Sequence, residues 1–171
     1  TQLFGLRDGG TGQARNADAP ALLITGTFAK IEEVPLEVIY ASSVETGEGD
    51  ASHLTDGDLG TIWHTMYSVT LAKYPHWVDF DAAAVKTMKG FVYTPRTDGP
   101  NGRVKDFEIY VSNDAENWGE PVCKGSFQNS GEPQRVLFAK PVKARYIRFR
   151  ALNEQGGNDY ASGAEFSLIA E

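Results

Sequence analysis

The chain has 171 residues, with 16 Lys and Arg against 23 Asp and Glu, which gives a formal net charge of −7 at pH 7. A chain of this length can bury one substantial core and at most one further small element. Its acidic balance argues against nucleic acid and anionic membrane surfaces as partners. No apolar run reaches the roughly 18 residues of a membrane-spanning helix, and no signal-peptide pattern follows Thr1, so we expect a portion of a larger protein.

Residues 1–34 differ in amino-acid composition from the rest of the chain. They begin with Gly- and Asn-rich stretches and then hold one short apolar segment at 21–24. We expect a connector, or the tail of a preceding domain, before a domain at 35–171. The alternative is an ordered linker that adds a strand to that domain.

From Leu36 onward, short alternating apolar runs are separated by clusters of Gly, Pro, Asn and Asp. This pattern is typical of an all-β sandwich. Helix should be limited to a turn or two, around 51–54. Cys123 is the single cysteine, which excludes an internal disulfide, and its setting favours a small buried side chain over a nucleophile. Strands are predicted at 36–40, 77–80, 88–93, 104–111, 121–124, 134–138, 145–150 and 165–169.

Two segments over a hundred residues apart suggest one site for a hard cation. The run Asp56-Gly57-Asp58-Leu59-Gly60-Thr61 supplies carboxylates, a hydroxyl and two glycines that let carbonyls turn inward. Calcium takes six to eight oxygen ligands of these kinds. Glu165, preceded by small residues, could complete the shell from the last strand. On spacing alone, an ordinary turn at 56–57 and a solvated Glu165 are equally good interpretations.

The same segments resemble the discoidin, or factor V/VIII type C, superfamily, and within it the family 32 carbohydrate-binding modules. The resemblance starts in the run from Ala51 to Thr65 and covers about residues 36–171. Four further blocks agree in the right order: Gly90-Phe91-Val92-Tyr93-Thr94-Pro95-Arg96 with Gly102-Arg103-Val104, Tyr110-Val111-Ser112-Asn113-Asp114-Ala115-Glu116-Asn117-Trp118, Arg145-Tyr146-Ile147-Arg148-Phe149, and Ala161-Ser162-Gly163-Ala164-Glu165-Phe166.

The resemblance implies an eight-stranded jelly-roll β-sandwich with a structural calcium ion that ties the first loop to the last strand. Its expected ligands are the carbonyls of His53, Asp58 and Ala164, Thr61, and the side chains of Asp56 and Glu165. Animal members usually close these ends with a disulfide, so its absence fits the bacterial branch.

The resemblance also implies a sugar site on the loops near the metal. The corresponding positions are His64, Arg96, Asn101 and an acidic residue of the 45–48 loop, for which we take Glu48. A guanidinium, an imidazole and an amide can bond sugar hydroxyls directionally, while an aromatic ring packs on the apolar face. The candidate rings are Tyr67 and Tyr160. Tyr74 and Trp77 are less favoured, and Trp77 is expected in the core.

Several of these residues also fit purely structural roles. His64 suits a loop hydrogen bond, Arg96 a solvated turn, and Asn101-Gly102 is a strong turn dipeptide in its own right. Trp63 and Trp118 are expected to be packing anchors, and His76 has no evident partner. The family often has an exposed tryptophan where Met66-Tyr67 stands here, which leaves the stacking partner and the sugar preference open.

A catalytic set is not evident in the sequence. Asp79 and Asp81 alternate onto one face of a strand, which we expect to be solvated. No nucleophile elbow, phosphate-binding loop or His-Glu-x-x-His motif is present. The spacing of His53, His64 and His76 matches no recognised zinc ligand set.

We therefore expect a non-catalytic, calcium-stabilised carbohydrate-binding module for terminal galactose or N-acetylhexosamine. It would be an extracellular, periplasmic or cell-surface accessory domain, with its catalytic domain in the same polypeptide, such as a hexosaminidase or chitobiase. The alternatives are a discoidin-type adhesion or membrane-surface domain, or a spacer without a ligand.

Overall fold

The structure, a computed structural model, describes residues 21–25 and 33–171. Within these ranges the fold is all-β, as predicted, and its one helical element is a 3₁₀ turn at the predicted place, η2 (Ala51–Thr55). The strands are β1 (Ala21–Thr25), β2 (Glu33–Val34), β3 (Glu37–Ala41), β4 (Trp63–His64), β5 (His76–Thr94), β6 (Asp106–Ser112), β7 (Cys123–Ser126), β8 (Gln134–Ala151), β9 (Ser162–Gly163) and β10 (Glu165–Ala170).

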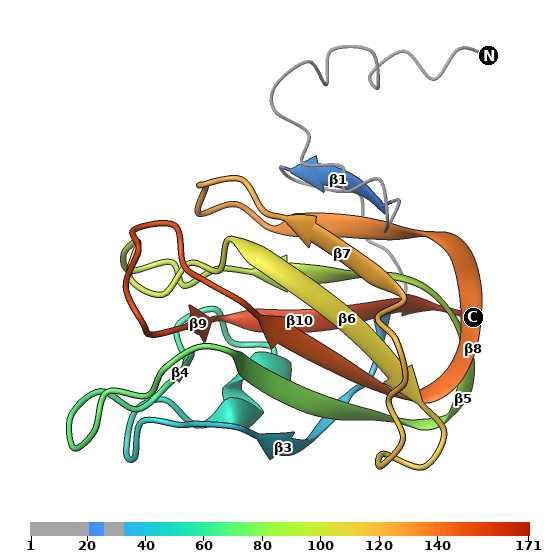
Figure 1. The fold of residues 1–171 in the computed structure, drawn as a ribbon, viewed down its shortest axis with the longest axis horizontal. Helices are drawn as coiled ribbons and strands as arrows, with labels where there is room; N and C mark the ends of the chain where they lie inside the picture. Colours follow the sequence, from blue (N-terminus) through green and yellow to red (C-terminus); the bar gives the residue numbers. More distant parts are fainter. Residues whose placement is uncertain (1–20, 26–32) are drawn as a thin grey trace.

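Two long antiparallel strands, β5 and β8, run through both layers of the sandwich (Figure 1). Their register shifts between Asp81 and Lys86 and again between Met88 and Gly90, so the pair bends from one layer into the other. A Cβ at Gly90 would lie 2.1 Å from the carbonyl oxygen of Val136, so only glycine permits this close approach. The sequence had predicted two separate strands in each of these segments, whereas each is one continuous bent strand.

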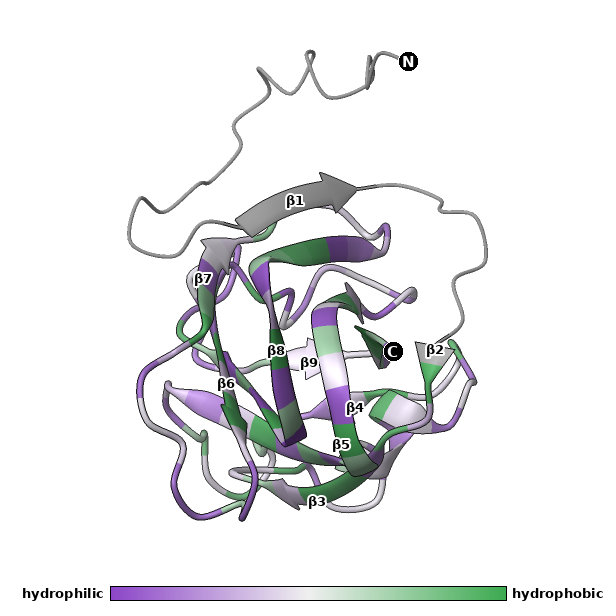
Figure 2. Cartoon of the chain, turned by 90° about the vertical axis from the view of Figure 1, so that its right-hand side faces the viewer, coloured by the Kyte–Doolittle hydropathy of each residue, from purple (hydrophilic) through white to green (hydrophobic). Residues whose placement is uncertain are grey.

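The bend sorts the strands into two layers that form the predicted eight-stranded sandwich. The front layer, which faces the reader in Figure 1, contains β3, residues 76–81 of β5, residues 146–151 of β8, β6 and β7. The back layer contains β2, β10, residues 88–94 of β5, residues 134–138 of β8, and β1. Hydrophobic and hydrophilic residues alternate along β8 in Figure 2, as expected when one face of each strand is buried.

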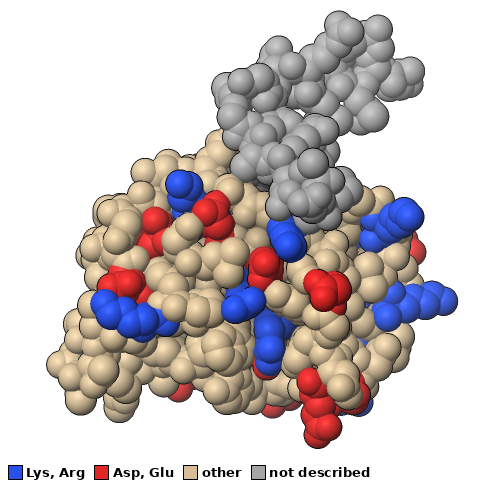
Figure 3. Space-filling view, viewed as in Figure 1, with Lys and Arg blue, Asp and Glu red and all other residues tan. Residues whose placement is uncertain are grey.

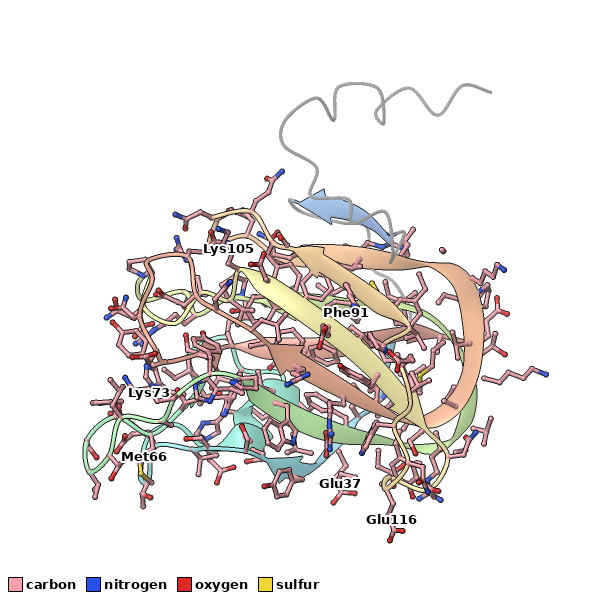
Figure 4. The ribbon with its side chains drawn as sticks, viewed as in Figure 1. Glu37, Met66, Lys73, Phe91, Lys105 and Glu116 are labelled. Atoms are coloured by element: carbon pink, nitrogen blue, oxygen red, sulfur yellow. The ribbon has the colours of Figure 1, made fainter. Side chains whose placement is uncertain are left out.

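Aromatic side chains fill the space between the layers. Phe91, labelled in Figure 4, is fully buried and stacks on Phe166 with ring centroids 5.3 Å apart. Phe107 stacks on Phe127 at 4.3 Å. Such pairs contribute about 0.5–1.5 kcal/mol each beyond the area they bury. Trp63 and Cys123 are also fully buried, as predicted, and burial raises the pKa of the Cys123 thiol to about 12.

Two sequence expectations about the front layer were wrong. Trp77 is not in the core: it is half-buried on the outer face, with its ring stacked on Tyr40 at 6.3 Å. Asp79 and Asp81 do share one face, but Asp79 is only 4% exposed and forms a two-point ion pair with Arg148. Asp81 forms the same kind of pair with Arg145. Both carboxylates therefore hold arginines instead of facing water.

Part of the predicted connector is ordered. Strand β1 pairs antiparallel with β8, from Ala21 opposite Phe138 to Thr25 opposite Gln134. This pairing agrees, for residues 21–25, with the alternative of a linker that adds a strand. Residues 1–20 and 26–32 lie outside the described part of the chain, so the connector as a whole stays a prediction.

The functional loops gather at one end of the sandwich, on the left in Figure 1, which we call the loop end. The short pair β4–β9 joins them, with Trp63 opposite Gly163 and His64 opposite Ser162. Ser162 also bridges to Arg103. Segments near residues 64, 103 and 162 are thus held side by side.

Candidate functional site

The loop end contains a hollow of about 430 Å³, which we call the loop-end hollow. All six residues that the sequence analysis proposed for sugar binding line it, although they come from five different segments. A seventh lining residue, Leu71, was not predicted. The lining residues are Glu48, His64, Tyr67, Leu71, Arg96, Asn101 and Tyr160.

His64 is 4% exposed and its orientation is fixed. Its Nδ1 lies 2.6 Å from the carbonyl oxygen of Thr65, so Nδ1 must carry the proton that is donated. In the neutral ring, Nε2 is then an acceptor. The ring packs edge-on to Tyr67 at 5.0 Å and lies 5.4 Å from the ring of Tyr160. The hollow therefore has an oriented acceptor between two aromatic rings.

Arg96 is held by Asp98. Its Nε and Nη2 donate to the two carboxylate oxygens at 2.6 and 2.7 Å. This pairing raises the pKa of Arg96 and lowers that of Asp98. The bonds to Asp98 use one side of the guanidinium, and Nη1 takes no part in them. Arg96 is thus a positioned donor and not the freely solvated turn arginine of the alternative interpretation.

The acidic loop at 45–48 carries two carboxylates with different roles. Glu48 is exposed and accepts a hydrogen bond from the hydroxyl of Tyr67. Glu45 is buried and accepts from the backbone N–H groups of Tyr67 and Ser68 at 2.7 and 3.0 Å. The choice of Glu48 as the lining residue agrees with this geometry. The positioning role of Glu45 was not predicted, because nothing in the sequence marks which of the two acids is buried.

A turn at 100–103 presents Asn101 to the hollow. Gly102 has φ +80°, and a Cβ there would lie 2.5 Å from Oγ of Ser162. That hydroxyl donates to the carbonyl of Asn101 at 2.7 Å. Buried Glu154 accepts from the N–H of Gly102 at 3.1 Å. The turn is therefore fixed by groups about 50 to 60 residues further along the chain.

Neither of the two less favoured aromatic candidates lines this hollow: Trp77 lies on the outer face of the front layer, and Tyr74 has other contacts. The hydroxyl of Tyr74 donates to the carbonyl of Tyr160 at 2.9 Å, and Tyr74 does not line the hollow. Its ring packs against His76 at 4.5 Å, and His76 Nε2 in turn bonds the carbonyl of Asp159 at 2.7 Å. His76 thus has a structural partner that the sequence did not reveal.

The predicted calcium loop contacts the first residue of β10, 108 residues further along the chain. Glu165 Oε1 accepts from the N–H of Gly57 at 2.7 Å, and the hydroxyl of Thr61 donates to Asp56 Oδ2 at 2.7 Å and to the carbonyl of Asp58 at 2.9 Å. Desolvation opposes ionisation of Asp56, but hydrogen bonds, first from Thr61, keep its pKa below the usual value.

The donors of this loop fit calcium better than a softer metal. No cluster of three or more His, Cys, Asp or Glu side chains that could hold a metal occurs in residues 21–25 and 33–171. The His53 ring bonds the carbonyl of Ile62 through Nδ1 at 2.8 Å, so this nitrogen is already engaged and does not contradict the carbonyl role that the resemblance gives His53. The Asp58 side chain accepts from the N–H of Gly60. The oxygens that meet here come from the carboxylates of Asp56 and Glu165, the hydroxyl of Thr61 and the carbonyl of Asp58, and they are of the kinds that Ca²⁺ prefers.

The comparisons with known proteins fall on this domain. The model of the F5/8 type C domain matches residues 38–166, and the chain belongs to this family. A sialidase of Micromonospora viridifaciens is 38% identical over 148 residues, which is 84% of this chain and 23% of that protein. The chain thus spans about a quarter of the length of this curated relative.

Two solved structures have the same fold. A family 32 module from Clostridium perfringens (CpGH89CBM32-5), in complex with GalNAc-β-1,3-galactose, superposes with a TM-score of 0.73 at 29% identity and covers 81% of this chain and 100% of its own. The family 32 module of C. perfringens NanJ, in complex with galactose, gives 0.70 at 25% identity, covering 86% and 98%. The chain is a non-catalytic module of the carbohydrate-binding type found in glycoside hydrolases, as the resemblance implied.

Proposed function

We propose that this module binds terminal galactose or N-acetylhexosamine residues in the loop-end hollow. The observation that carries the proposal is the convergence of six side chains of the right chemistry from five segments on one hollow of about 430 Å³. The two family 32 structures with galactose-containing ligands support the same sugar class.

The chemistry of recognition follows from the fixed groups. Arg96 and Asn101 offer donors, and His64 Nε2 and Glu48 offer acceptors, so adjacent hydroxyls of a galactose-type ring can be bonded in one orientation. The ring of Tyr67, 45% exposed, offers a face for the apolar side of the sugar. Because the hollow is open and buries little of a ligand, we expect weak affinity.

Calcium is the second part of the proposal. The ion would be held by Asp56, Thr61 and Glu165 together with the carbonyls of His53, Asp58 and Ala164. It would supply charge neutralisation to two neighbouring carboxylates and link the loop after η2 to β10. Because it binds only the folded state, it would stabilise that state.

The wider role is that of an accessory domain in an exported glycoside hydrolase. The relatives are several times longer than this chain, so a catalytic domain in the same polypeptide is the expected partner. Binding of substrate glycans would raise the local substrate concentration for that domain.

In residues 21–25 and 33–171, no helix has the length and apolar character that crossing a bilayer requires.

One observation favours a membrane-surface function as the second candidate. The loop after β4 exposes Val69 by 85% and Leu71 by 41% beside the hollow. It is the loop that carries Met66 and Lys73 in Figure 4. Sedimentation with anionic vesicles, in the absence of any glycan response, would favour this candidate.

A glycan array followed by calorimetry tests the proposed function. The wild-type chain should bind galactose- or N-acetylhexosamine-terminated glycans, and His64→Ala and Arg96→Ala should abolish binding without changing the melting temperature by more than a few degrees. Lys105→Ala is the matched control, since it removes an exposed cation outside the hollow. Full binding by both hollow variants would refute the proposed site.

A further inference from the structure

The outer face of the front layer contains a second hollow, of about 280 Å³, which we call the sheet-face hollow. It shares no lining residue with the loop-end hollow. Three aromatic residues and two arginines form most of its wall, and no carboxylate lines it. The lining residues are Trp77, Tyr110, Trp118, Gly119, Arg148 and Arg150. Figure 3 shows basic and acidic side chains side by side in the middle of this face.

Strand register brings the cations and rings together. Trp77 of β5 lies opposite Arg150 of β8, and Arg148 lies opposite Tyr110 of β6. The guanidinium carbon of Arg148 is 4.3 Å from the ring centroid of Trp118 and 5.5 Å from that of Trp77. Arg148 therefore lies over two tryptophan rings, and its positive charge is attracted to the electron-rich face of each.

Carboxylates hold both arginines. The buried Asp79 accepts from Nε and Nη2 of Arg148 at 2.6 and 2.8 Å. Glu108 accepts from Nη1 of Arg150 at 3.1 Å, and the Tyr110 hydroxyl does so at 3.3 Å. In the described part of the chain, Nε and Nη2 of Arg150 have no further hydrogen-bond partner. The Arg150 side chain is 35% exposed. The side of its guanidinium that carries Nε and Nη2 is therefore available for a ligand.

Trp118 is presented by a loop with its own internal support. Asp114 accepts hydrogen bonds from the backbone N–H groups of Glu116 and Asn117 at 2.9 and 2.8 Å, and from the Asn117 amide at 2.8 Å. These bonds, first those from Asn117, hold the pKa of Asp114 well below its usual value. Ala115 takes φ +61°, a conformation that costs energy outside glycine and needs such support. Trp118 is therefore held in place before any ligand arrives.

We propose that the sheet-face hollow is a second glycan site, specific for a sugar that carries a carboxylate. The aromatic rings suit the C–H face of a pyranose, which a simple inorganic anion would leave unused. The side of Arg150 that faces away from Glu108 suits a carboxylate, which it can bond at two points, whereas a neutral sugar offers no such two-point partner. A uronic-acid type of sugar satisfies both features. The site is separate from the loop-end hollow, so it stands or falls independently of the proposed function.

The test is an NMR titration of the ¹⁵N-labelled 171-residue chain with galacturonate, and with galactose as the neutral counterpart. Galacturonate should shift the indole N–H signal of Trp118 and the Nε–H signal of Arg150, whereas galactose should not. Concentrations up to about 50 mM suffice, since an open subsite allows millimolar dissociation constants.

Variants assign the response to this face. Arg150→Gln and Trp118→Ala should each weaken galacturonate binding tenfold or more, and His64→Ala should leave it unchanged. If Trp118→Ala does not fold, Trp118→Phe and Arg150→Gln provide the answer. The proposal is overturned if neither signal responds to galacturonate, if galactose shifts them equally, or if His64→Ala removes the response.

Discussion

The two hollows of this domain are built from different kinds of segment. The loop-end hollow takes its side chains from loops and one short strand. Two of its loop segments are fixed by buried groups distant in the sequence, the backbone of Tyr67 by Glu45 and the turn at Asn101 by Ser162. The sheet-face hollow takes four of its six lining residues from three neighbouring strands, where β-register sets their spacing. One loop of the loop-end hollow can therefore move without the others, whereas the strand residues of the sheet-face hollow change position only if the sandwich itself unfolds.

Removal of Arg148 should give the largest effect. Asp79, whose side chain is 6% exposed, would lose its cation, and breaking a buried pair from one side costs about 3–5 kcal/mol. Arg148→Met should therefore lower the free energy of urea unfolding by about this amount. The matched variant Arg145→Met breaks the pair with Asp81, in which Arg145 is 40% exposed, and should cost clearly less, because solvent screens an exposed pair. Equal losses in the two variants would contradict the assigned difference in burial.

Calcium removal should come next. With the ion at 100 times its Kd, binding to the folded state alone adds about 2.7 kcal/mol, so chelation should lower the melting temperature by roughly 5–10 °C in a chain of this size. Asp56→Ala and Glu165→Ala should melt low with or without calcium. Asp58→Asn, which keeps the carbonyl ligand and an acceptor for the Gly60 N–H, should retain the calcium response. An unchanged melting temperature after chelation would contradict the proposed calcium site.

Acid should loosen the loop end through Glu45. Hydrogen bonds from the Ser68 side chain and from the N–H groups of Tyr67 and Ser68 lower its pKa below the ordinary value of a glutamate. A folded-state pKa below the unfolded value means that the stabilisation is complete at neutral pH and is lost as the pH falls through the folded-state pKa. The amide NMR signals of Tyr67 and Ser68 should therefore titrate with a midpoint below the ordinary pKa of a glutamate. A midpoint at or above that value would argue against the anchor, and Glu45→Gln should abolish the titration.

The smallest effect should be at Leu71. This apolar residue lines a hollow whose other walls are polar or aromatic, so it is placed to contact the methyl of an N-acetyl group. Leu71→Ala should weaken binding of N-acetylgalactosamine by a factor of about 2–5, the cost of losing one or two buried methyl contacts, and leave galactose unchanged. Val69→Ala, on the same loop but 85% exposed, is the control. Equal losses for both sugars would assign Leu71 to the loop fold.

The fold class, the 3₁₀ turn, the buried Trp63 and Cys123, and the six residues around the loop-end hollow could all be predicted from the amino-acid sequence. They could be predicted because alternation and turn chemistry are local, and because the family motifs are specific enough to transfer residue by residue. The sequence did not reveal that β5 and β8 each run through both layers, that Trp77 lies outside the core, or that Asp79 is buried against Arg148. Those outcomes depend on which strands become neighbours and in what register, and no local pattern encodes a partner 69 residues away.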